Sequence, residues 1–402
     1  MSQHSAFDVA RARADTPGCA TVAHFNHAGC SLAPRVVTDA QVAWLRAEAL
    51  TGGYELAEQR AGEVAATYDE VAALIGAAPG EVALVENATF AWHQAFWSLG
   101  LRPGDRILTA DAEYASGFIS FLQARRRLGV TVEVLPDDES GQVSLGALAE
   151  ALDDGRGPVG LVALTHVPTN GGLVNPAAEV GRLTRDAGVP FLLDACQSVG
   201  QMPVDVEAIG CDMLAATGRK FLRAPRGTGF LYVRRSLLDR TDLAPLEPAF
   251  LDLLGAEWVA PDRFELRADA RRFESWESSL AAQAGLRAAV AYTRSWGVDA
   301  IATQVSAVAD RLRARLADVP GVTVHDRGRR RCGIVTFTRD GVDAEAARRA
   351  LAAQAVNVSV SSPSSTLLDA LARDLPPLVR ASVHYTTTDD EIDRLVGAVA
   401  RL

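Results

Sequence analysis

The sequence is almost without lysine. Its 402 residues include 40 basic ones, but Lys220 is the single lysine and the other 39 are arginines. Arginine replaces lysine on solvated surfaces at little cost, so a compositional bias explains the missing lysines but not the one that remains. Because arginine stays protonated, whereas lysine becomes a nucleophilic amine once its pKa falls, Lys220 is a candidate for amine chemistry.

The sequence also lacks a cysteine pair, a long apolar run and an excess of positive charge. The cysteines are odd in number and form no CxxC pair, which argues against a disulfide framework or a zinc site; they are Cys19, Cys30, Cys196, Cys211 and Cys332. No stretch, residues 1–24 included, holds about 18 uninterrupted apolar residues. A net charge of −10 disfavours nucleic acid or anionic membrane as a partner. We therefore expect a cytoplasmic protein with no metal, signal peptide or membrane span.

What the sequence does contain is an alternation of short apolar runs and helical patterns. The runs VALVE, RILTAD, VTVEVLP, VGLVALTHV and VPFLLDA are separated by stretches such as FAWHQAFWSLG and FISFLQARRRLG. Strands that are apolar on both faces and separated by helices are typical of a parallel sheet covered on both sides. The sequence therefore predicts an α/β fold.

The pattern changes after about residue 280. A long amphipathic stretch over residues 288–319 is followed by strand-like GIVTFT, NVSVS and VRASVHY, with helical AEAARRALAAQA and DDEIDRLVGAVARL between and after them. This arrangement is typical of a small α+β layer domain. Since 402 residues also exceed the usual size of one core, we predict an N-terminal segment (1–24), a large domain (25–280) and a small C-terminal domain (281–402).

Polar residues follow several of the predicted strands. Ligands of open α/β sheets bind beyond the carboxyl ends of the strands, so these residues are candidates for a site, although each could also serve only in a turn or cap. An aspartate at the end of a buried strand needs a cationic partner if it is ionised. The candidates in chain order are Ala88 and Thr89 at a helix start, Tyr114, Thr169, Asn170, Asp194, Gln197, Thr217, Arg219 and Lys220.

The order of these motifs resembles the class V aminotransferase family, the fold-type I pyridoxal phosphate enzymes that include cysteine desulfurases, isopenicillin N epimerase-like proteins and kynureninase. The likeness runs from FNHAGCSLAP, at residues 25–34, to the C-terminus. Its strongest part is DACQSVGQMPVDV followed by ATGRKFLRAPRGTGFLY, which look like the family's Asp-x-x-Gln strand end and lysine-bearing loop. The resemblance implies pyridoxal 5′-phosphate as cofactor.

The resemblance also implies how the cofactor is held. Lys220 would bind its aldehyde as a Schiff base and later move the substrate Cα proton. Asp194 would keep the pyridine nitrogen protonated, which makes the ring an electron sink. The remaining contacts would be Gln197 with Thr169 or Asn170 at the phenolic oxygen, Tyr114 stacked on the ring where relatives carry histidine, and Ala88, Thr89, Thr217 and Arg219 at the phosphate.

Substrate contacts follow from the same resemblance. Arg380, in LVRASVHYTTTDDEIDRL, looks like the family's substrate arginine and would bind the α-carboxylate in a bidentate pair. The segment with His27 and Gly29 would fold over the site, although His27 could equally be an exposed loop residue. RRFESWE stands where the family approaches the partner subunit's phosphate, which implies a homodimer with shared sites, but Trp276 and Glu277 replace the usual Gly-Thr.

One departure from the family bears on the reaction. Cysteine desulfurases need a thiolate shortly before the substrate arginine, but here the loop reads NVSVSSPSSTLLDAL. We therefore expect a carbon–sulfur β-lyase that cleaves a cysteine S-conjugate to thiol, pyruvate and ammonia. The alternatives are an oxygen-dependent decarboxylating deaminase, an aminotransferase or epimerase, and a degenerate binding protein without the cofactor. A DNA-binding regulator has no room for its additional module.

Overall fold

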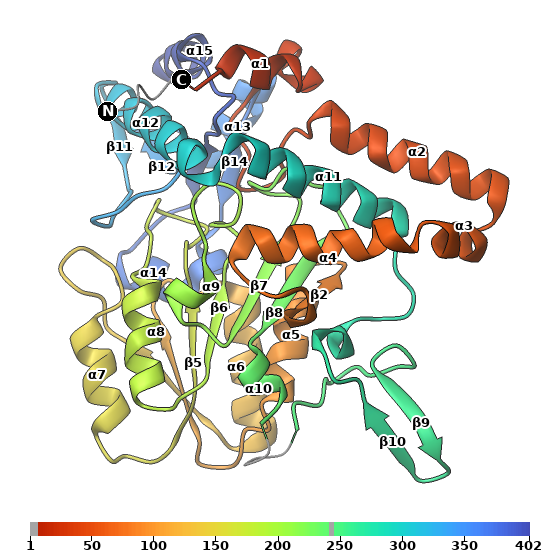
Figure 1. Ribbon diagram of the computed structural model, residues 1–402. Coiled ribbons are helices and arrows are strands. Elements are labelled where there is room, and N and C mark those ends of the chain that lie inside the picture. The colour runs from red at the N-terminus through yellow and green to blue at the C-terminus, as the bar shows by residue number, and fades with distance from the viewer. Residues whose placement is uncertain (1–6, 241–244) are drawn as a thin grey trace, which may run out of the picture.

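The centre of the molecule is a seven-stranded sheet with the strand order β2-β8-β7-β6-β5-β3-β4 (Figure 1). The computed structural model describes residues 7–240 and 245–402. The strands are β2 (Val82–Val85), β3 (Arg106–Ala110), β4 (Thr131–Leu135), β5 (Val159–Thr165), β6 (Phe191–Asp194), β7 (Met213–Thr217) and β8 (Gly229–Val233). Strands β3 to β7 pair in parallel, whereas β8 runs antiparallel to both β2 and β7. The predicted α/β fold with a mostly parallel sheet is confirmed.

Helices cover both faces of this sheet, which is why its strands are apolar on both sides. Leu84 and Leu108 point into a core shared with α4, α7, α8 and α11, whereas their neighbours Ala83 and Ile107 point into a second core shared with α5 and α6. These helices are α4 (Ala61–Ile75), α5 (Ala88–Ser98), α6 (Ala115–Leu128), α7 (Leu145–Asp153), α8 (Ala177–Asp186) and α11 (Leu280–Trp296). The shorter α9 (Val206–Ile209) and α10 (Arg235–Leu238) join the later strands.

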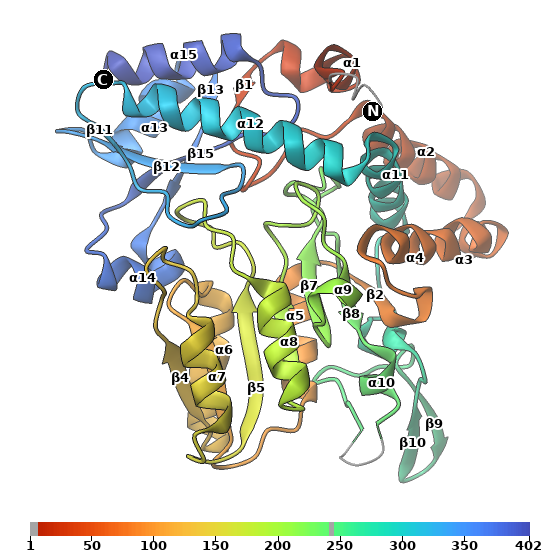
Figure 2. The same cartoon turned by 60° about the vertical axis from the view of Figure 1, so that its left-hand side comes forward.

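A second, four-stranded antiparallel sheet has the order β11-β12-β15-β14. Its strands are β11 (Val322–Val324), β12 (Ile334–Arg339), β14 (Ser359–Ser361) and β15 (Leu378–Ser382). It packs against α12 (Val298–Ala317), α13 (Ala344–Ala352) and α15 (Asp389–Ala400), while α14 (Leu367–Ala372) lies beyond β14. The second sheet stands over the carboxyl ends of the first (Figure 2).

The N-terminal residues join the core of this second sheet. Strand β1 (Ala23–His24) pairs in parallel with β13 (Val356–Asn357). Ala12 of α1 (Val9–Ala14) and Phe25 are fully buried in the same core. The predicted boundaries at residues 24 and 280 stay predictions, but α1 and β1 contribute packing contacts to this core.

The predicted amphipathic stretch at 288–319 forms two helices, because Gly297 separates α11 from α12. Gly297 has a φ of 79°, a conformation that side chains with a Cβ rarely adopt. The chain turns at this residue, and α11 lies along α2 (Arg35–Thr51) and α4 while α12 lies on the second sheet (Figure 1). Helix α3 (Gly53–Gln59) joins α2 to α4.

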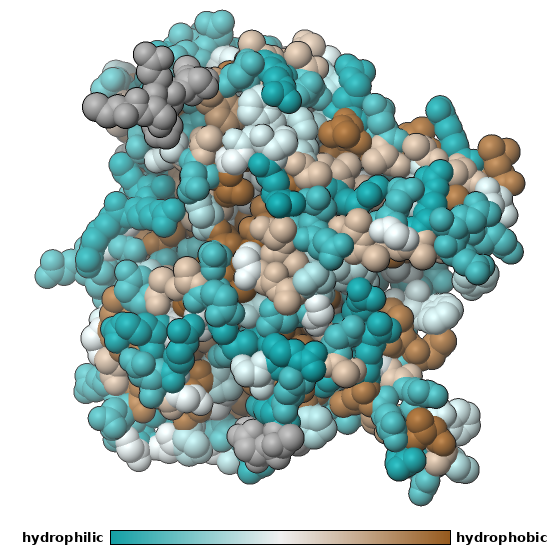
Figure 3. Space-filling model, in the orientation of Figure 1, coloured by the Kyte–Doolittle hydropathy of each residue, from teal (hydrophilic) through white to brown (hydrophobic). Residues whose placement is uncertain are grey.

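A hairpin of β9 (Ala256–Ala260) and β10 (Arg263–Leu266) projects from the body and exposes Trp258 and Phe264 (Figures 1 and 3). Short 3₁₀ turns occur at Pro17–Ala20, Pro79–Glu81, Ala270–Phe273 and Pro363–Thr366. Across the described ranges, no helix has the length and apolar character to cross a bilayer. A cytoplasmic location stays a prediction.

Candidate active site

The candidate site lies at the carboxyl edge of the seven-stranded sheet, under the second sheet. Asp194 is the last residue of β6 and Thr217 the last of β7. Because parallel strands end at the same edge, both residues lie at this edge of the sheet. Arg380 comes to this edge from β15 of the second sheet, where it pairs with Ser359 of β14.

Lys220 lies in the loop between β7 and β8. The loop is closed by backbone hydrogen bonds from Gly218 to Thr228 and from Ala224 to Gly218, each 2.9 Å long. The Lys220 Nζ atom lies 6.0 Å from the centroid of the Tyr114 ring. Burial lowers the pKa of the Lys220 amine, and Arg219 and Arg380 lower it further against the opposing charge of Asp194. The lowered pKa suits Lys220 to amine chemistry, and its role as a Schiff-base lysine stays a prediction.

One cavity brings together four of the predicted cofactor-binding residues. Its walls include Asp194 at the end of β6 with the nearby Cys196, Tyr114 before α6, and Ala88 and Thr89 at the start of α5. The Asp194 Oδ1 atom accepts a hydrogen bond of 2.8 Å from the Cys196 amide, which orients the carboxylate. Residues separated by more than a hundred positions therefore face one space.

The start of α5 has the form of an anion site. The Asn87 side chain caps the helix by accepting a hydrogen bond from the Phe90 amide at 2.9 Å. The amides of Ala88 and Thr89 precede the capped position, where helix N–H groups and the helix dipole favour a phosphate. Gly229 of β8 permits the close approach, because a Cβ there would lie 3.1 Å from the Asn87 carbonyl carbon. Thr217 pairs with Gly229 and so lies beside this helix start.

Arg219 is turned toward the N-terminal loop. Its guanidinium donates a hydrogen bond to the Gly29 carbonyl, and the Ser31 amide donates to the Arg219 carbonyl at 2.9 Å. A Cβ on Gly29 would lie 2.4 Å from the Asn26 Oδ1 atom, so a larger residue there would displace the Asn26 side chain. The predicted phosphate contact of Arg219 stays a prediction, as does the substrate contact of Gly29.

A chain of polar side chains joins the two sheets. The Arg380 Nη1 atom donates to the Thr169 hydroxyl at 2.5 Å. The Gln197 Nε2 atom lies 3.5 Å from the same hydroxyl and donates to the Ala28 carbonyl at 3.1 Å. Asn170 donates to the Thr366 hydroxyl at 2.8 Å. Burial lowers the pKa of Arg380 to about 10, still well above neutrality, so its guanidinium is charged.

Several buried atoms of this network have no hydrogen-bond partner among the described residues. They are the Gln197 Oε1, Asn170 Oδ1 and Arg380 Nε atoms. Leaving a buried polar group unpaired costs about 1–3 kcal/mol of stability. Two open acceptors and one open donor therefore favour a ligand that can both donate and accept hydrogen bonds. The site also holds the basic groups of Lys220, Arg219 and Arg380 beside the carboxylate of Asp194. Pyridoxal phosphate carries a phosphate and an amino acid carries a carboxylate, and these two anionic groups fit this set of donors.

His27 is buried, with 1% of its surface exposed, so the alternative of an exposed loop histidine is wrong. Its ring packs edge-on against the rings of His24 and His384, and its Nδ1 atom lies 2.9 Å from the Ser31 hydroxyl. Burial, with repulsion from the neighbouring histidines and Arg223, lowers the pKa of His27 well below its ordinary range. His27 is therefore neutral, and its contact with substrate stays a prediction.

Sequence reasoning missed Glu113, although it precedes Tyr114. Its carboxyl accepts hydrogen bonds from the Thr165 hydroxyl at 2.5 Å, the Tyr114 amide at 3.0 Å and the Thr109 hydroxyl at 3.2 Å. These bonds tie the ends of β3 and β5 together beneath Tyr114. Burial raises the pKa of Glu113 to about 7. The only sequence signal was a carboxylate directly after a strand with no nearby basic residue.

Similarity to known proteins extends over most of the chain. Residues 23–395 match the family described as Aminotransferase class-V. A probable cysteine desulfurase of Methanothermobacter thermautotrophicus is 30% identical over 86% of this chain and 84% of its own length. The probable cysteine desulfurase of Halobacterium salinarum is 28% identical over 99% of this chain and 97% of its own.

Two solved structures superpose over nearly the whole chain. The apo cysteine desulfurase of Thermococcus onnurineus has a TM-score of 0.89, is 24% identical and covers 100% of this chain and 99% of its own. A C-DES mutant with glycine covalently linked to its PLP cofactor has a TM-score of 0.85, is 25% identical and covers 96% and 98%. The family match spans nearly all of the described fold, and the strand-end Asp194, Tyr114 and the start of α5 face one cavity. The chain therefore belongs to the class V aminotransferase family and is a pyridoxal phosphate-dependent enzyme of fold type I.

Proposed function

We propose that this pyridoxal phosphate-dependent lyase cleaves the Cβ–S bond of a cysteine S-conjugate. The names of the relatives, cysteine desulfurases, support chemistry at the sulfur of cysteine. The observation that carries the narrower proposal is the segment beside Arg380. Ser359 pairs with Arg380, and the buried Ser361 hydroxyl has no hydrogen-bond partner in the described part of the chain. Hydroxyls, which cannot accept sulfur as a persulfide, stand where a desulfurase needs a thiolate.

The cysteines elsewhere support the same proposal. Burial raises the pKa of Cys332 to about 11, and burial also raises the pKa of Cys196 well above its ordinary value. Both thiols are therefore protonated and poorly nucleophilic at neutral pH. Cys30, which follows Gly29, is half-buried and is the thiol to test directly.

The proposed mechanism assigns one task to each residue. Arg380, oriented by the Thr169 hydroxyl, binds the α-carboxylate, and Asp194 pairs with the ring nitrogen. Pyridoxal phosphate, when bound, supplies the electron sink that stabilises negative charge at Cα. Lys220 takes the Cα proton, for which its lowered pKa suits it.

The leaving group then departs without a covalent sulfur acceptor. The electron pair of the Cα–H bond forms the new Cα–Cβ double bond, and the electron pair of the Cβ–S bond leaves with the thiolate, which gains a proton. The three-carbon product reacts with one water to give pyruvate and ammonia. Thiolates are good leaving groups, so no further protein nucleophile is needed.

The test is incubation of the holoenzyme with a panel of cysteine S-conjugates and with free cysteine. Pyruvate, ammonia and thiol in equal amounts support elimination. Alanine with sulfide from cysteine plus a thiol reductant, lost in Cys30→Ser, would instead identify a desulfurase. Aldehyde, carbon dioxide and oxygen uptake would identify the oxidative alternative, and a ketoacid formed only with an amino acceptor would identify transamination. Lys220→Arg is the inactive control.

We also propose that the protein is a homodimer with shared sites. The hairpin residue Trp258 is 79% exposed, and Trp276, in the segment that the family resemblance places near a partner subunit, is 49% exposed. A second copy covering these side chains would remove apolar surface from water. Light scattering should give twice the chain mass of 42.6 kDa; a mass that remains at one chain would contradict the proposal.

A further inference from the structure

The strand that carries Arg380 continues into a contact with the lysine loop. His384 and Tyr385 follow the end of β15 by two and three residues. The His384 Nε2 atom lies 2.8 Å from the carbonyl oxygen of Phe221, the residue after Lys220. The second sheet therefore touches the backbone next to the reactive amine.

The hydrogen-bond directions at His384 are determined by its two neighbours. The Tyr385 amide donates to the His384 Nδ1 atom at 2.8 Å, so Nδ1 carries no proton. The Nε2 atom then carries the proton and donates it to the Phe221 carbonyl. Burial, together with the nearby Arg223 charge, lowers the pKa of His384 to about 3, so this neutral tautomer persists across the working range of pH.

Arg223 makes a second contact between the same two segments. Its Nη1 atom donates to the Tyr385 hydroxyl at 2.6 Å, and its Nη2 and Nε atoms donate to the Thr16 hydroxyl at 2.5 Å and the Leu32 carbonyl at 2.9 Å. Arg223 is 1% exposed and has a φ of 62°, an unfavourable conformation for a residue with a Cβ. The backbone after Lys220 is thus held by the second sheet and the N-terminal segment.

We propose that His384 is a positioning residue that couples the binding of a carboxylate at Arg380 to the orientation of Lys220. The inference rests on the proposed function, in which Arg380 binds the substrate carboxylate. Arg380 is on β15, which is hydrogen-bonded to β12 on one side and β14 on the other. His384 lies in the direct continuation of this strand. When a carboxylate binds Arg380, its effect on this strand therefore reaches the Phe221 carbonyl through His384.

The test compares His384→Gln with His384→Met in the holoenzyme. Glutamine keeps a terminal N–H near the place of the His384 Nε2 atom, whereas methionine has similar length but no donor. Hydrogen exchange of the 218–224 backbone is measured with and without propionate, which has the substrate's carboxylate but no amine. We expect propionate to slow this exchange in the unmodified enzyme and in His384→Gln, and to have no effect in His384→Met.

The outcomes separate this inference from the proposed function. Spectral titration with propionate shows whether it binds. If it binds the unmodified enzyme but leaves exchange unchanged, only the coupling is overturned; if it does not bind, the assignment of Arg380 fails and the coupling fails with it. If propionate protects the loop equally in His384→Met, only the coupling is overturned. Arg380→Ala serves as the control in which no response is expected.

Steady-state kinetics provide the second readout. Misplacement of a catalytic group slows the chemical step, so kcat should fall about 10- to 100-fold in His384→Met. KM should change little because Arg380 is intact, and His384→Gln should recover most of the loss. A purely structural role predicts a lower unfolding midpoint with kcat unchanged in the folded fraction, and that result would overturn the proposal.

Discussion

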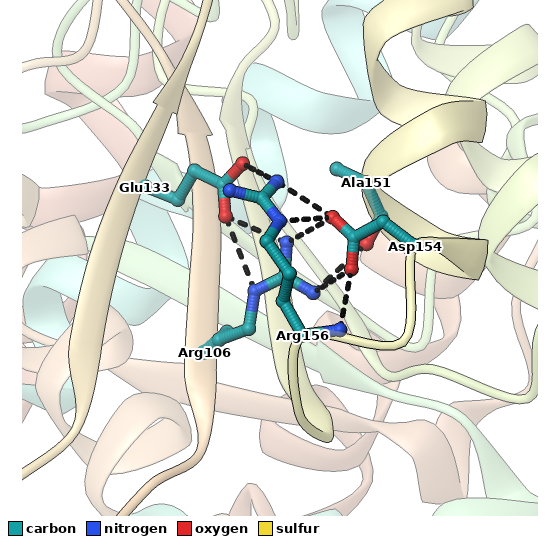
Figure 4. Close-up of polar contacts among 5 residues, drawn as sticks. All are labelled: Arg106, Glu133, Ala151, Asp154 and Arg156. Carbon is teal, nitrogen blue, oxygen red and sulfur yellow. Dashed lines mark hydrogen bonds and ion pairs between the residues drawn. The ribbon is translucent and has the colours of Figure 1, made fainter.

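The seven-stranded sheet has an ion-pair network at its amino edge and the candidate site at its carboxyl edge. At the amino edge, Arg106 of β3 contacts Glu133 of β4 at 2.6 Å and Asp154 after α7 at 2.9 Å (Figure 4). Arg156 contacts the same two carboxylates, each at 2.6 Å. Two cations and two anions of the chain satisfy one another there.

The carboxyl edge is organised in the opposite way. Lys220, Arg219 and Arg380 stand beside one strand-end carboxylate, and within residues 7–240 and 245–402 the Arg380 Nε atom has no hydrogen-bond partner. Charge balanced within the chain contributes to folding, whereas charge left unbalanced and buried attracts a ligand of opposite sign. The contrast predicts that substitutions at the carboxyl edge affect turnover and those at the amino edge affect stability.

The largest effect is expected for Lys220→Arg. Arginine keeps the positive charge but can neither bind the cofactor aldehyde nor accept the Cα proton, so turnover should fall by about 10³-fold or more. Borohydride reduction of the unmodified holoenzyme followed by peptide mapping should place the cofactor mass on the Lys220 peptide. A label elsewhere, or an active Lys220→Arg enzyme, contradicts the assignment.

Asp194→Asn should lower turnover by about 10²-fold while much of the cofactor stays bound. Asparagine keeps an oxygen for the Cys196 amide but removes the charge that pairs with the ring nitrogen. Visible absorbance measures bound cofactor and a product assay measures turnover. Asp212→Asn is the matched control, because Asp212 accepts a hydrogen bond from Phe191 at the other end of β6. Equal turnover in both variants would remove the special role of Asp194.

Arg380→Ala should raise KM for the S-conjugate about 10²-fold, because a desolvated charge pair costs several kcal/mol to break. Arg380→Lys keeps the charge but loses the bidentate geometry, so its KM should lie between those of the unmodified enzyme and Arg380→Ala. Spectral titration of the holoenzyme with substrate measures the affinity. An unchanged titration midpoint in Arg380→Ala would show that another residue binds the carboxylate.

Arg106→Met, at the amino edge, should lower stability and leave catalysis intact, with kcat/KM within about twofold of the unmodified enzyme. Removing the buried guanidinium leaves Glu133 and Asp154 without their shared partner, so the unfolding midpoint should drop by about 5 °C. Calorimetry of the apo and holo forms checks the shift. Loss of activity at an unchanged midpoint would mean that the two edges are coupled.

The smallest expected effect is a pH dependence of stability, which has opposite sign for Asp154 at the amino edge and Glu113 at the carboxyl edge. The Arg156 backbone N–H, with the Arg156 and Arg106 guanidiniums, lowers the pKa of Asp154 to about 2 from an ordinary 3.8. Its contribution to stability is therefore complete above about pH 4 and is lost as the pH falls toward 2. Burial raises the pKa of Glu113 to about 7 from 4.5, so stability should fall as the pH rises between those values.

Thermal midpoints across pH for Asp154→Asn and Glu113→Gln check these two slopes. Each variant should flatten only its own side of the stability profile. If either profile remained parallel to that of the unmodified protein, the corresponding carboxyl would not be the group that titrates.

The candidate site could be anticipated wherever its chemistry depends on local chain geometry. Asp194 ends a strand and Asn87 caps a helix, and both positions can be read from neighbouring residues. Glu113 and Thr366 could not be assigned, because their partners, Thr165 and Asn170, are brought to them only by strand order and by the second sheet. The burial of His27 has the same origin, since His384 lies more than 350 positions away.

The sequence by itself predicted the α/β pattern, singled out Lys220 for amine chemistry and pointed to the family through its motifs, because apolar periodicity, a single surviving amine and short motifs are local properties. The tertiary structure decided that β8 lies between β2 and β7, that α1 and β1 join the core of the second sheet, and that His384 contacts the lysine loop. Those contacts join residues far apart in the chain. They form only when both sheets are folded, because their stability comes from apolar surface that the two layers bury together.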